Sequence, residues 1–267
     1  MAALRPVTLI TGASAGIGVA LAREFARHGH ALALVARRED RLNALADEIA
    51  ASGQPRPIVI AADIAQADCA RKLGETLAAH GAEPQYVVNN AGFGLVGLAA
   101  SRDRDEQLSM IDLNVRALTE LSLYFIDCLE RHRGGILNVG SMAGFLPGPG
   151  MAVYYATKAF VVSFSQALSS ELKPRGIRVT VLCPGPVPTE FGERAGVKMS
   201  SLAPPILTQT AETVAELGYA GLMAGKRVVI PGPLNRLIIG LIRFMPRGLL
   251  LAALDKRQAR RRSANGS

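Results

Sequence analysis

The chain of 267 residues is long enough to bury a substantial core, and its content of 49% apolar residues excludes an intrinsically disordered protein. The net charge of +8 is concentrated at one end: residues 234–267 hold eight Lys/Arg and one acidic residue, whereas the other 233 residues hold 22 basic and 21 acidic ones. A nearly neutral body without Trp excludes a nucleic-acid-binding domain.

The side chains that bind metals or form disulfides are scattered along the chain. Cys69, Cys128 and Cys183 are odd in number and have no paired spacing, which predicts a reducing compartment with neither disulfides nor a zinc site. The histidines form no metal-ligand pattern, so no bound metal is expected. An apolar run begins at Val7 and leaves no room for a signal peptide before it, so we expect a cytoplasmic protein.

Short apolar runs alternate with longer segments of helical period. The runs predict buried strands at 7–10, 31–35, 58–61, 86–88, 135–139, 177–182 and 227–230. The amphipathic segments predict helices at 17–28, 41–51, 67–80, 105–131 and 152–173. This alternation predicts an α/β fold: a Rossmann-like, doubly wound parallel sheet of about seven strands with helices on both faces. Ligands bind such sheets beyond the carboxyl ends of the strands.

A glycine-rich loop follows the first predicted strand. It reads Thr11-Gly-Ala-Ser-Ala-Gly-Ile-Gly18 and leads directly into a predicted helix. Gly12, Gly16 and Gly18 permit a tight turn and let the backbone approach a pyrophosphate, while the helix start offers unpaired N–H groups and the positive end of its dipole. Glycines alone also suit an ordinary turn, but the order strand, loop, helix favours a nucleotide site.

Two further motifs occur downstream. Asn89-Asn-Ala-Gly92 follows the fourth predicted strand, and Tyr154-x-x-x-Lys158 lies near the start of a predicted helix. Together with the G-x-x-x-G-x-G loop, they resemble the short-chain dehydrogenase/reductase family over about residues 7–232. The resemblance implies an oxidoreductase that acts on CH–OH groups with NAD(P). It also implies cofactor contacts from Ile17, Asn90, Ala91 and Gly92, although the asparagine motif equally suits a role in stabilising the sheet.

The residues after the second and third strands bear on the choice of cofactor. An acid after the second strand selects NAD through the ribose 2′-OH, whereas a cation there binds the 2′-phosphate of NADP. The sequence has Arg37 at this place, with Ser14 as a second donor, so we expect NADP(H) rather than NAD(H). A pair of solvated arginines is the alternative. After the third strand, the resemblance implies that Asp63 bonds the adenine amino group and that Ile64 packs on the ring.

The predicted reacting group is a tyrosine beside a lysine. Tyr154 and Lys158 lie about one helical turn apart and project from one face. We expect the ammonium, together with the oxidised nicotinamide, to lower the pKa of the phenol below its usual value near 10. Ser141 follows a predicted strand, where its hydroxyl can bond the substrate oxygen. The resemblance implies that these residues form a tetrad with Asn114, which holds a water near the lysine, and that Lys158 bonds the nicotinamide ribose.

The segment after the sixth strand predicts the substrate end of the site. It resembles the family's cover over the nicotinamide, with contacts from Pro184, Gly185, Val187 and Thr189, although its prolines also suit a plain rigid turn. Residues 190–207 occupy the place of the family's variable substrate lid. A small hydrophobic ketone, aldehyde or 3-oxoacyl compound is expected, because apolar residues flank the motifs: Phe93, Ala143, Phe145, Leu146 and Met151.

The chain is expected to form a catalytic domain, residues 1–233, followed by an apolar and basic tail, residues 234–267. Charges at Arg236, Arg243 and Arg247 argue against a membrane-spanning helix in this tail. Two interpretations stay open. Residues 234–262 lie on the inner face of an anionic membrane, or they pack on another subunit of a homodimer or homotetramer.

Two other functions are compatible with the same motifs. One is a non-catalytic protein that senses NADP and regulates a partner. The other is an epimerase or dehydratase that recycles its cofactor. The intact Ser141, Tyr154 and Lys158 argue against a sensor, which needs no proton donor.

Overall fold

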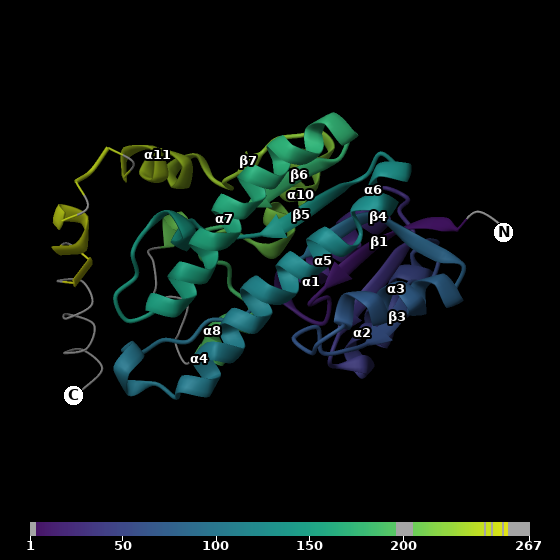
Figure 1. Ribbon diagram of the computed structural model, residues 1–267, viewed down its shortest axis with the longest axis horizontal. Helices are drawn as coiled ribbons and strands as arrows, with labels where there is room; N and C mark the ends of the chain where they lie inside the picture. The colour runs from purple at the N-terminus through teal and green to yellow at the C-terminus, as the bar shows by residue number, and fades with distance from the viewer. Residues whose placement is uncertain (1–3, 196–204, 243, 247, 253, 256–267) are drawn as a thin grey trace.

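The computed structural model describes residues 4–195, 205–242, 244–246, 248–252 and 254–255. Its centre is a parallel sheet of seven strands in the order β3-β2-β1-β4-β5-β6-β7 (Figure 1). The strands are β1 (Arg5–Thr11), β2 (Leu32–Ala36), β3 (Ile58–Ala61), β4 (Ala82–Asn89), β5 (Gly135–Val139), β6 (Arg178–Leu182) and β7 (Val228–Val229). This architecture confirms the predicted α/β fold, and each predicted strand is present.

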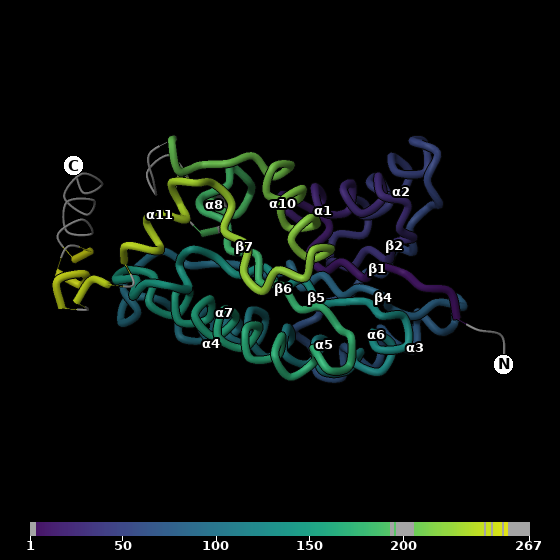
Figure 2. Tube along the Cα trace, turned by 90° about the horizontal axis from the view of Figure 1, so that it is seen from above, coloured from purple at the N-terminus to yellow at the C-terminus, as the bar shows by residue number. Residues whose placement is uncertain are grey.

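Helices cover both faces of the sheet (Figure 2). One face carries α1 (Gly16–Arg27), α2 (Glu39–Ala51) and α10 (Ala211–Met223). The other carries α3 (Cys69–Ala79), α5 (Leu118–Tyr124), α6 (Ile126–Arg131) and α7 (Ala152–Leu172). Because both faces are covered, the strands are buried on both sides, which explains their continuous apolar sequences.

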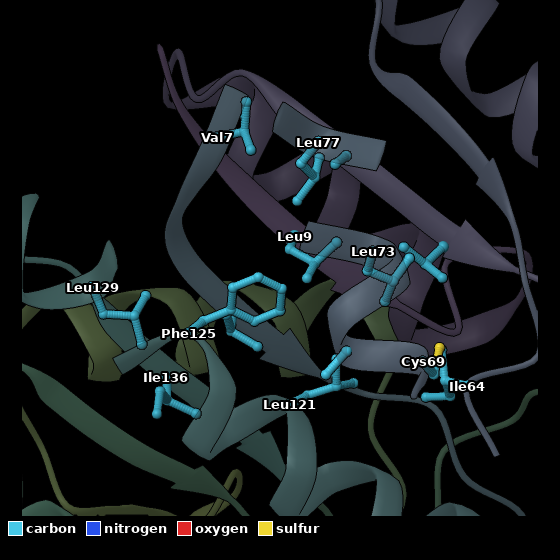
Figure 3. Packing of buried hydrophobic residues seen from close by; sticks show 14 of the residues in the cluster. Val7, Leu9, Ile64, Cys69, Leu73, Leu77, Leu121, Phe125, Leu129 and Ile136 are labelled. Carbon is cyan, nitrogen blue, oxygen red and sulfur yellow. The ribbon is translucent and has the colours of Figure 1, made fainter. Parts of the chain in front are cut away.

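The two faces of the sheet hold separate hydrophobic clusters. Successive residues of β1 alternate between them: Leu9 points to the face of α3 and α5, and Ile10 to the face of α1 and α2. Figure 3 shows the first cluster, in which Leu9 lies near Leu73 of α3 and Phe125 of the neighbouring helical segment. This packing holds the strand ends, and therefore the loops that follow them, in fixed positions.

The strand order reverses between β1 and β4. β1 pairs with β2 on one side and with β4 on the other, so the connections that leave β1 and β4 diverge. A crevice at this point of a doubly wound sheet is the usual place for a ligand. The glycine-rich loop and the Asn89–Gly92 motif both begin there.

The prediction of one helix over 105–131 is wrong. The segment divides into α4 (Arg104–Ile111), a π-helical turn η2 (Asp112–Ala117), α5 and α6, with a break at Phe125. The π-helical turn contains Asn114, whose side chain bonds residues of two neighbouring segments. Turns of this kind occur often at functional sites.

The predicted lid is described only in part. Residues 191–195 form the short helix α8 (Phe191–Ala195), and η5 (Pro205–Leu207) follows later. Residues 196–204 lie outside the described part of the chain. The tail begins with α11 (Pro233–Ile242).

Candidate active site

A cleft of about 930 Å³ lies beyond the carboxyl ends of the strands. Most of the predicted site residues line it: Gly12, Ser14, Gly16, Ile17, Arg37, Asp63, Ile64, Asn90, Ala91, Gly92, Ser141, Tyr154, Lys158, Pro184, Gly185, Val187 and Thr189. Gly18 and Asn114 are not on its surface but lie directly behind it. The sequence motifs therefore converge on one place in the fold.

The glycine-rich loop leaves an open floor at one end of the cleft. Gly12 has a φ of +67°, which side-chain-bearing residues rarely adopt. At Gly18 a Cβ would lie 2.2 Å from the carbonyl oxygen of Gly12, so only glycine allows this approach. α1 begins here without a side-chain cap on its first N–H groups. These uncapped groups and the bare loop fit a bound pyrophosphate.

The Asn89–Gly92 motif fixes this loop to the sheet. The Asn90 side chain donates to the carbonyl oxygens of Thr11 (2.9 Å) and Gly12 (3.2 Å). The Thr11 hydroxyl accepts from the backbone N–H groups of Asn90 (3.1 Å) and Ala91 (3.2 Å). The motif thus stabilises the sheet, which was the alternative to a cofactor contact. Asn90, Ala91 and Gly92 line the cleft as well.

Two arginines follow β2 at the edge of the cleft. Arg37 lines the cleft, is exposed and forms no ion pair with any residue of the described chain. Arg38 instead donates to the Ser14 hydroxyl and forms an ion pair of 2.9 Å with Glu190. Arg41 also pairs with Glu190, and these two hydrogen bonds hold the pKa of Glu190 below its usual range. The sequence analysis did not identify Arg38 or Glu190 as site residues.

The end of β3 supplies the predicted adenine contacts. Asp63 lines the cleft, and one of its carboxylate oxygens accepts from the backbone N–H of Ala65 at 3.0 Å. A hydrogen bond of this kind is typical of an aspartate that stabilises a turn. It leaves the second carboxylate oxygen free to accept from another donor. Ile64 is nearly fully buried beside it.

Tyr154, Ser141 and Lys158 meet at the centre of the cleft. The Ser141 side chain lies close enough to the Tyr154 hydroxyl to favour its ionised form, and the backbone N–H of Ala143 orients Ser141 by donating to its Oγ at 3.1 Å. Lys158 is buried and donates from Nζ to the Val139 carbonyl oxygen at 2.8 Å. Its Nζ lies 5.9 Å from the centre of the Tyr154 ring. The lysine therefore approaches the phenol ring without bonding its hydroxyl.

Burial shifts the titration of this pair. It raises the pKa of Tyr154 to about 12, and the hydrogen bond from Ser141 opposes this rise. It also lowers the pKa of Lys158 to about 8. The expected lowering of the tyrosine pKa is therefore absent from the protein alone, because removal from water outweighs the interaction with Ser141. Burial thus disfavours the charged form at both positions, although a lysine with this pKa still carries its charge at pH 7.

The Asn114 side chain is engaged with protein groups. Its Oδ1 accepts from the Phe93 N–H at 3.1 Å, and its Nδ2 donates to the Phe93 carbonyl oxygen at 2.9 Å and to the Thr157 hydroxyl at 3.1 Å. Both amide hydrogens are thus occupied. Asn114 ties the Asn89–Gly92 segment to the helix that carries Tyr154 and Lys158.

The substrate end of the cleft is mostly apolar. Four of the five predicted pocket residues line it: Phe93, Ala143, Leu146 and Met151. Phe145 does not, because it packs on the hydrophobic cluster of Val161 and Cys183. The Phe191 ring lies 5.5 Å from that of Tyr154.

The tail completes the substrate end, which the sequence analysis did not predict. Ile238, Ile242, Leu250 and Leu254 line the cleft. Their separations of four, eight and four residues repeat at helical spacing, a signal available in the sequence. The tail therefore forms part of the cleft's lining.

Comparisons with known proteins agree with this geometry. The family model for short chain dehydrogenases matches residues 6–199. Sulfoacetaldehyde reductase of Chromohalobacter salexigens is 40% identical over 185 residues, which cover 68% of this chain and 72% of that protein. A short-chain dehydrogenase from Sphingobium yanoikuyae, solved in complex with NADPH, is 33% identical, with a TM-score of 0.77 over 91% of this chain and 97% of that one.

A second solved structure is the bulky-bulky ketone specific alcohol dehydrogenase from Comamonas testosteroni. It is 30% identical, with a TM-score of 0.73, and the match covers 91% of this chain and 95% of that one. Since the family model spans more than half of the residues, the chain belongs to the short-chain dehydrogenase/reductase family, and it is an oxidoreductase that acts on CH–OH or carbonyl groups with NAD(P).

Proposed function

We propose that the protein is an NADP(H)-dependent reductase of small apolar ketones, aldehydes or 3-oxoacyl compounds, with Tyr154 as proton donor and acceptor. The observation that carries this proposal is the convergence of Ser141 and Tyr154 on one cleft, with Lys158 buried behind them. A protein that only senses NADP has no use for such a pair. The apolar side chains around it favour an apolar substrate.

The cofactor, when bound, supplies the hydride to the carbonyl carbon. Tyr154 donates its proton to the carbonyl oxygen, and the high pKa of the phenol keeps that proton in place at neutral pH until transfer. Ser141 donates to the same oxygen and stabilises the charge that develops there. Loss of that proton leaves a phenolate, which the positive charge of Lys158 stabilises. Asn114 ties the helix that carries both residues to the cofactor segment.

Different residues would hold the different parts of NADP(H). The glycine-rich loop and the start of α1 fit the pyrophosphate, and Asp63 and Ile64 the adenine. Asn90, Ala91, Gly92 and Lys158 would contact the riboses, and the nicotinamide would lie against Pro184, Gly185, Val187 and Thr189. We assign the 2′-phosphate to Arg37 and Ser14, because Arg37 faces the cleft without an ion-pair partner among the described residues.

The proposal includes a cytoplasmic location and assembly into a homodimer or homotetramer. Exposed apolar side chains on α4, α5 and α7 support assembly: Leu108, Ile111, Leu123, Tyr124 and Phe160. The side chains named above at the substrate end of the cleft are apolar, so they favour neither a carboxylate nor a phosphate group on the substrate.

The test is NADPH oxidation against short, medium and long acyl compounds and cyclic ketones, with NADH in parallel. We expect turnover with apolar ketones and faster turnover with NADPH. Tyr154→Phe should lose at least about a thousandfold in turnover while it binds NADPH as the wild type does. Equal turnover in that variant would contradict the assignment of Tyr154. Product formation without net NADPH consumption would indicate an epimerase or dehydratase instead.

A further inference from the structure

The tail presents an apolar face that no described residue covers. In α11 the inward side chains Ile238 and Ile242 line the cleft. On the opposite side, Leu237 is 57% exposed and Leu241, one turn later, is 61% exposed. Phe244, just beyond the helix, is 85% exposed. Exposed apolar groups on this scale mark an interaction surface.

This apolar face belongs to the most basic part of the sequence. Residues 234–267 hold eight Lys/Arg and the single acid Asp255, a net charge of +7, whereas the rest of the chain is nearly neutral. Arg236 lies exposed on α11, directly before Leu237. Large apolar side chains with an excess of positive charge are the combination that binds an anionic lipid surface.

We propose that α11, with Phe244 just beyond it, docks on an anionic membrane surface, with Leu237, Leu241 and Phe244 entering the lipid and the substrate end of the cleft facing it. Figure 1 shows α11 and the following turns at the end of the molecule opposite the N-terminus, beyond the carboxyl ends of the strands. Within the described residues, no helix is long and apolar enough to cross a bilayer.

A second copy of the chain fits this face less well. A two-fold symmetric dimer brings the same patch of both subunits together. Here each copy would contribute the same exposed Arg236 beside Leu237, from a tail whose sequence has an excess of cations. Like charges across an interface oppose association, whereas anionic headgroups neutralise them.

The experiment is sedimentation of the full-length protein, without cofactor, with vesicles of phosphatidylglycerol and phosphatidylcholine in equal parts or of phosphatidylcholine alone. We expect binding to the anionic vesicles only, and weaker binding as the salt concentration rises. The double variant Leu237→Ser, Leu241→Ser should bind at least about tenfold more weakly. The matched control is Leu98→Ser with Leu217→Ser, whose side chains are 44% and 41% exposed elsewhere on the surface.

Three results would overturn the proposal. The first is the absence of wild-type binding to anionic vesicles. The second is an equal loss of binding in the tail variant and in the control. The third is a lipid-independent dimer, seen by size-exclusion chromatography, that the tail variant alone abolishes, because a second copy would then cover this face. Binding is measured without catalysis, so its failure is distinct from a failure of the proposed reaction.

Discussion

The two walls of the cleft are built in different ways. The cofactor wall consists of loops at the ends of buried strands, and hydrogen bonds such as those of Asn90 to Thr11 and Gly12 fix its backbone. The substrate wall consists of the short helix α8, the loop after β5 and the inward face of the tail, and its lining side chains are mostly apolar. The comparison indicates that cofactor geometry is built into the sheet, whereas substrate selection depends on segments attached to it.

The cofactor wall should lose its affinity for NADPH when a side chain is added where Gly18 packs against Gly12. Gly18→Ala places a Cβ 2.2 Å from the Gly12 carbonyl oxygen, so the loop must move away from the position that fits a pyrophosphate. We expect NADPH affinity, measured by fluorescence titration, to fall by at least about a hundredfold. Gly240→Ala is the control, since its added Cβ meets no atom within 4 Å. Unchanged NADPH binding in Gly18→Ala would show that this loop does not hold the dinucleotide.

Burial of Lys158, which the proposed reaction needs, should lower the free energy of unfolding. Burial lowers the pKa of Lys158 from 10.5 to about 8, so the unfolded chain binds more protons between these pH values. The contribution of Lys158 to stability should therefore rise with pH from about 8 to 10.5. The raised pKa values of Cys183 and Tyr154 oppose this rise, because each lowers stability as the pH passes its unfolded value, about 9 for the thiol and 10 for the phenol. Lys158→Met should lose turnover, gain up to about 3 kcal/mol in unfolding free energy at pH 7 and lose the rise above pH 8.

Chemical denaturation at several pH values, without cofactor, measures this effect. The lost hydrogen bond to the Val139 carbonyl oxygen reduces the gain, but it does not remove the difference in pH dependence. An identical pH profile in wild type and variant would mean that Lys158 titrates as a solvated amine.

The preference for NADP should depend on one arginine of the cofactor wall. Arg37→Ala removes the cation assigned to the 2′-phosphate, so the NADPH-over-NADH ratio in kcat/KM should fall by about 10- to 100-fold. Arg41→Ala is the matched control, because this residue pairs with Glu190 and does not line the cleft. If Arg37→Ala kept the full preference, we would assign the phosphate to Arg38 after separation from Glu190.

The substrate wall should respond to the tail without affecting the cofactor. Ile242→Ala shortens a side chain that lines the cleft, and we expect KM for an apolar ketone to rise by about three- to tenfold. NADPH affinity should stay unchanged. Leu241→Ala, the outward neighbour, should leave KM for a soluble ketone unchanged. Equal effects of the two variants would mean that the tail contributes only to stability.

The sequence indicated the candidate site residues where the loop or the proposed reaction requires one particular type of amino acid at a position. The spacing of Gly12, Gly16 and Gly18 and of Tyr154 and Lys158 could be recognised because the loop geometry and the helical turn permit few alternatives. The partners Arg38 and Glu190 are 152 residues apart, and no local pattern indicates that they meet. The π-helical turn at Asn114 and the tail's position on the cleft likewise depend on tertiary packing, which overrides local periodicity.

The most direct test of the account is a crystal structure of the protein with NADP⁺. We predict that the dinucleotide lies along the cofactor wall and that the hydroxyls of Tyr154 and Ser141 both face C4 of the nicotinamide, with room for a carbonyl oxygen about 3 Å from each. A nicotinamide ring bound away from these hydroxyls, or a Tyr154 side chain turned out of the cleft in the complex, would contradict the central claim.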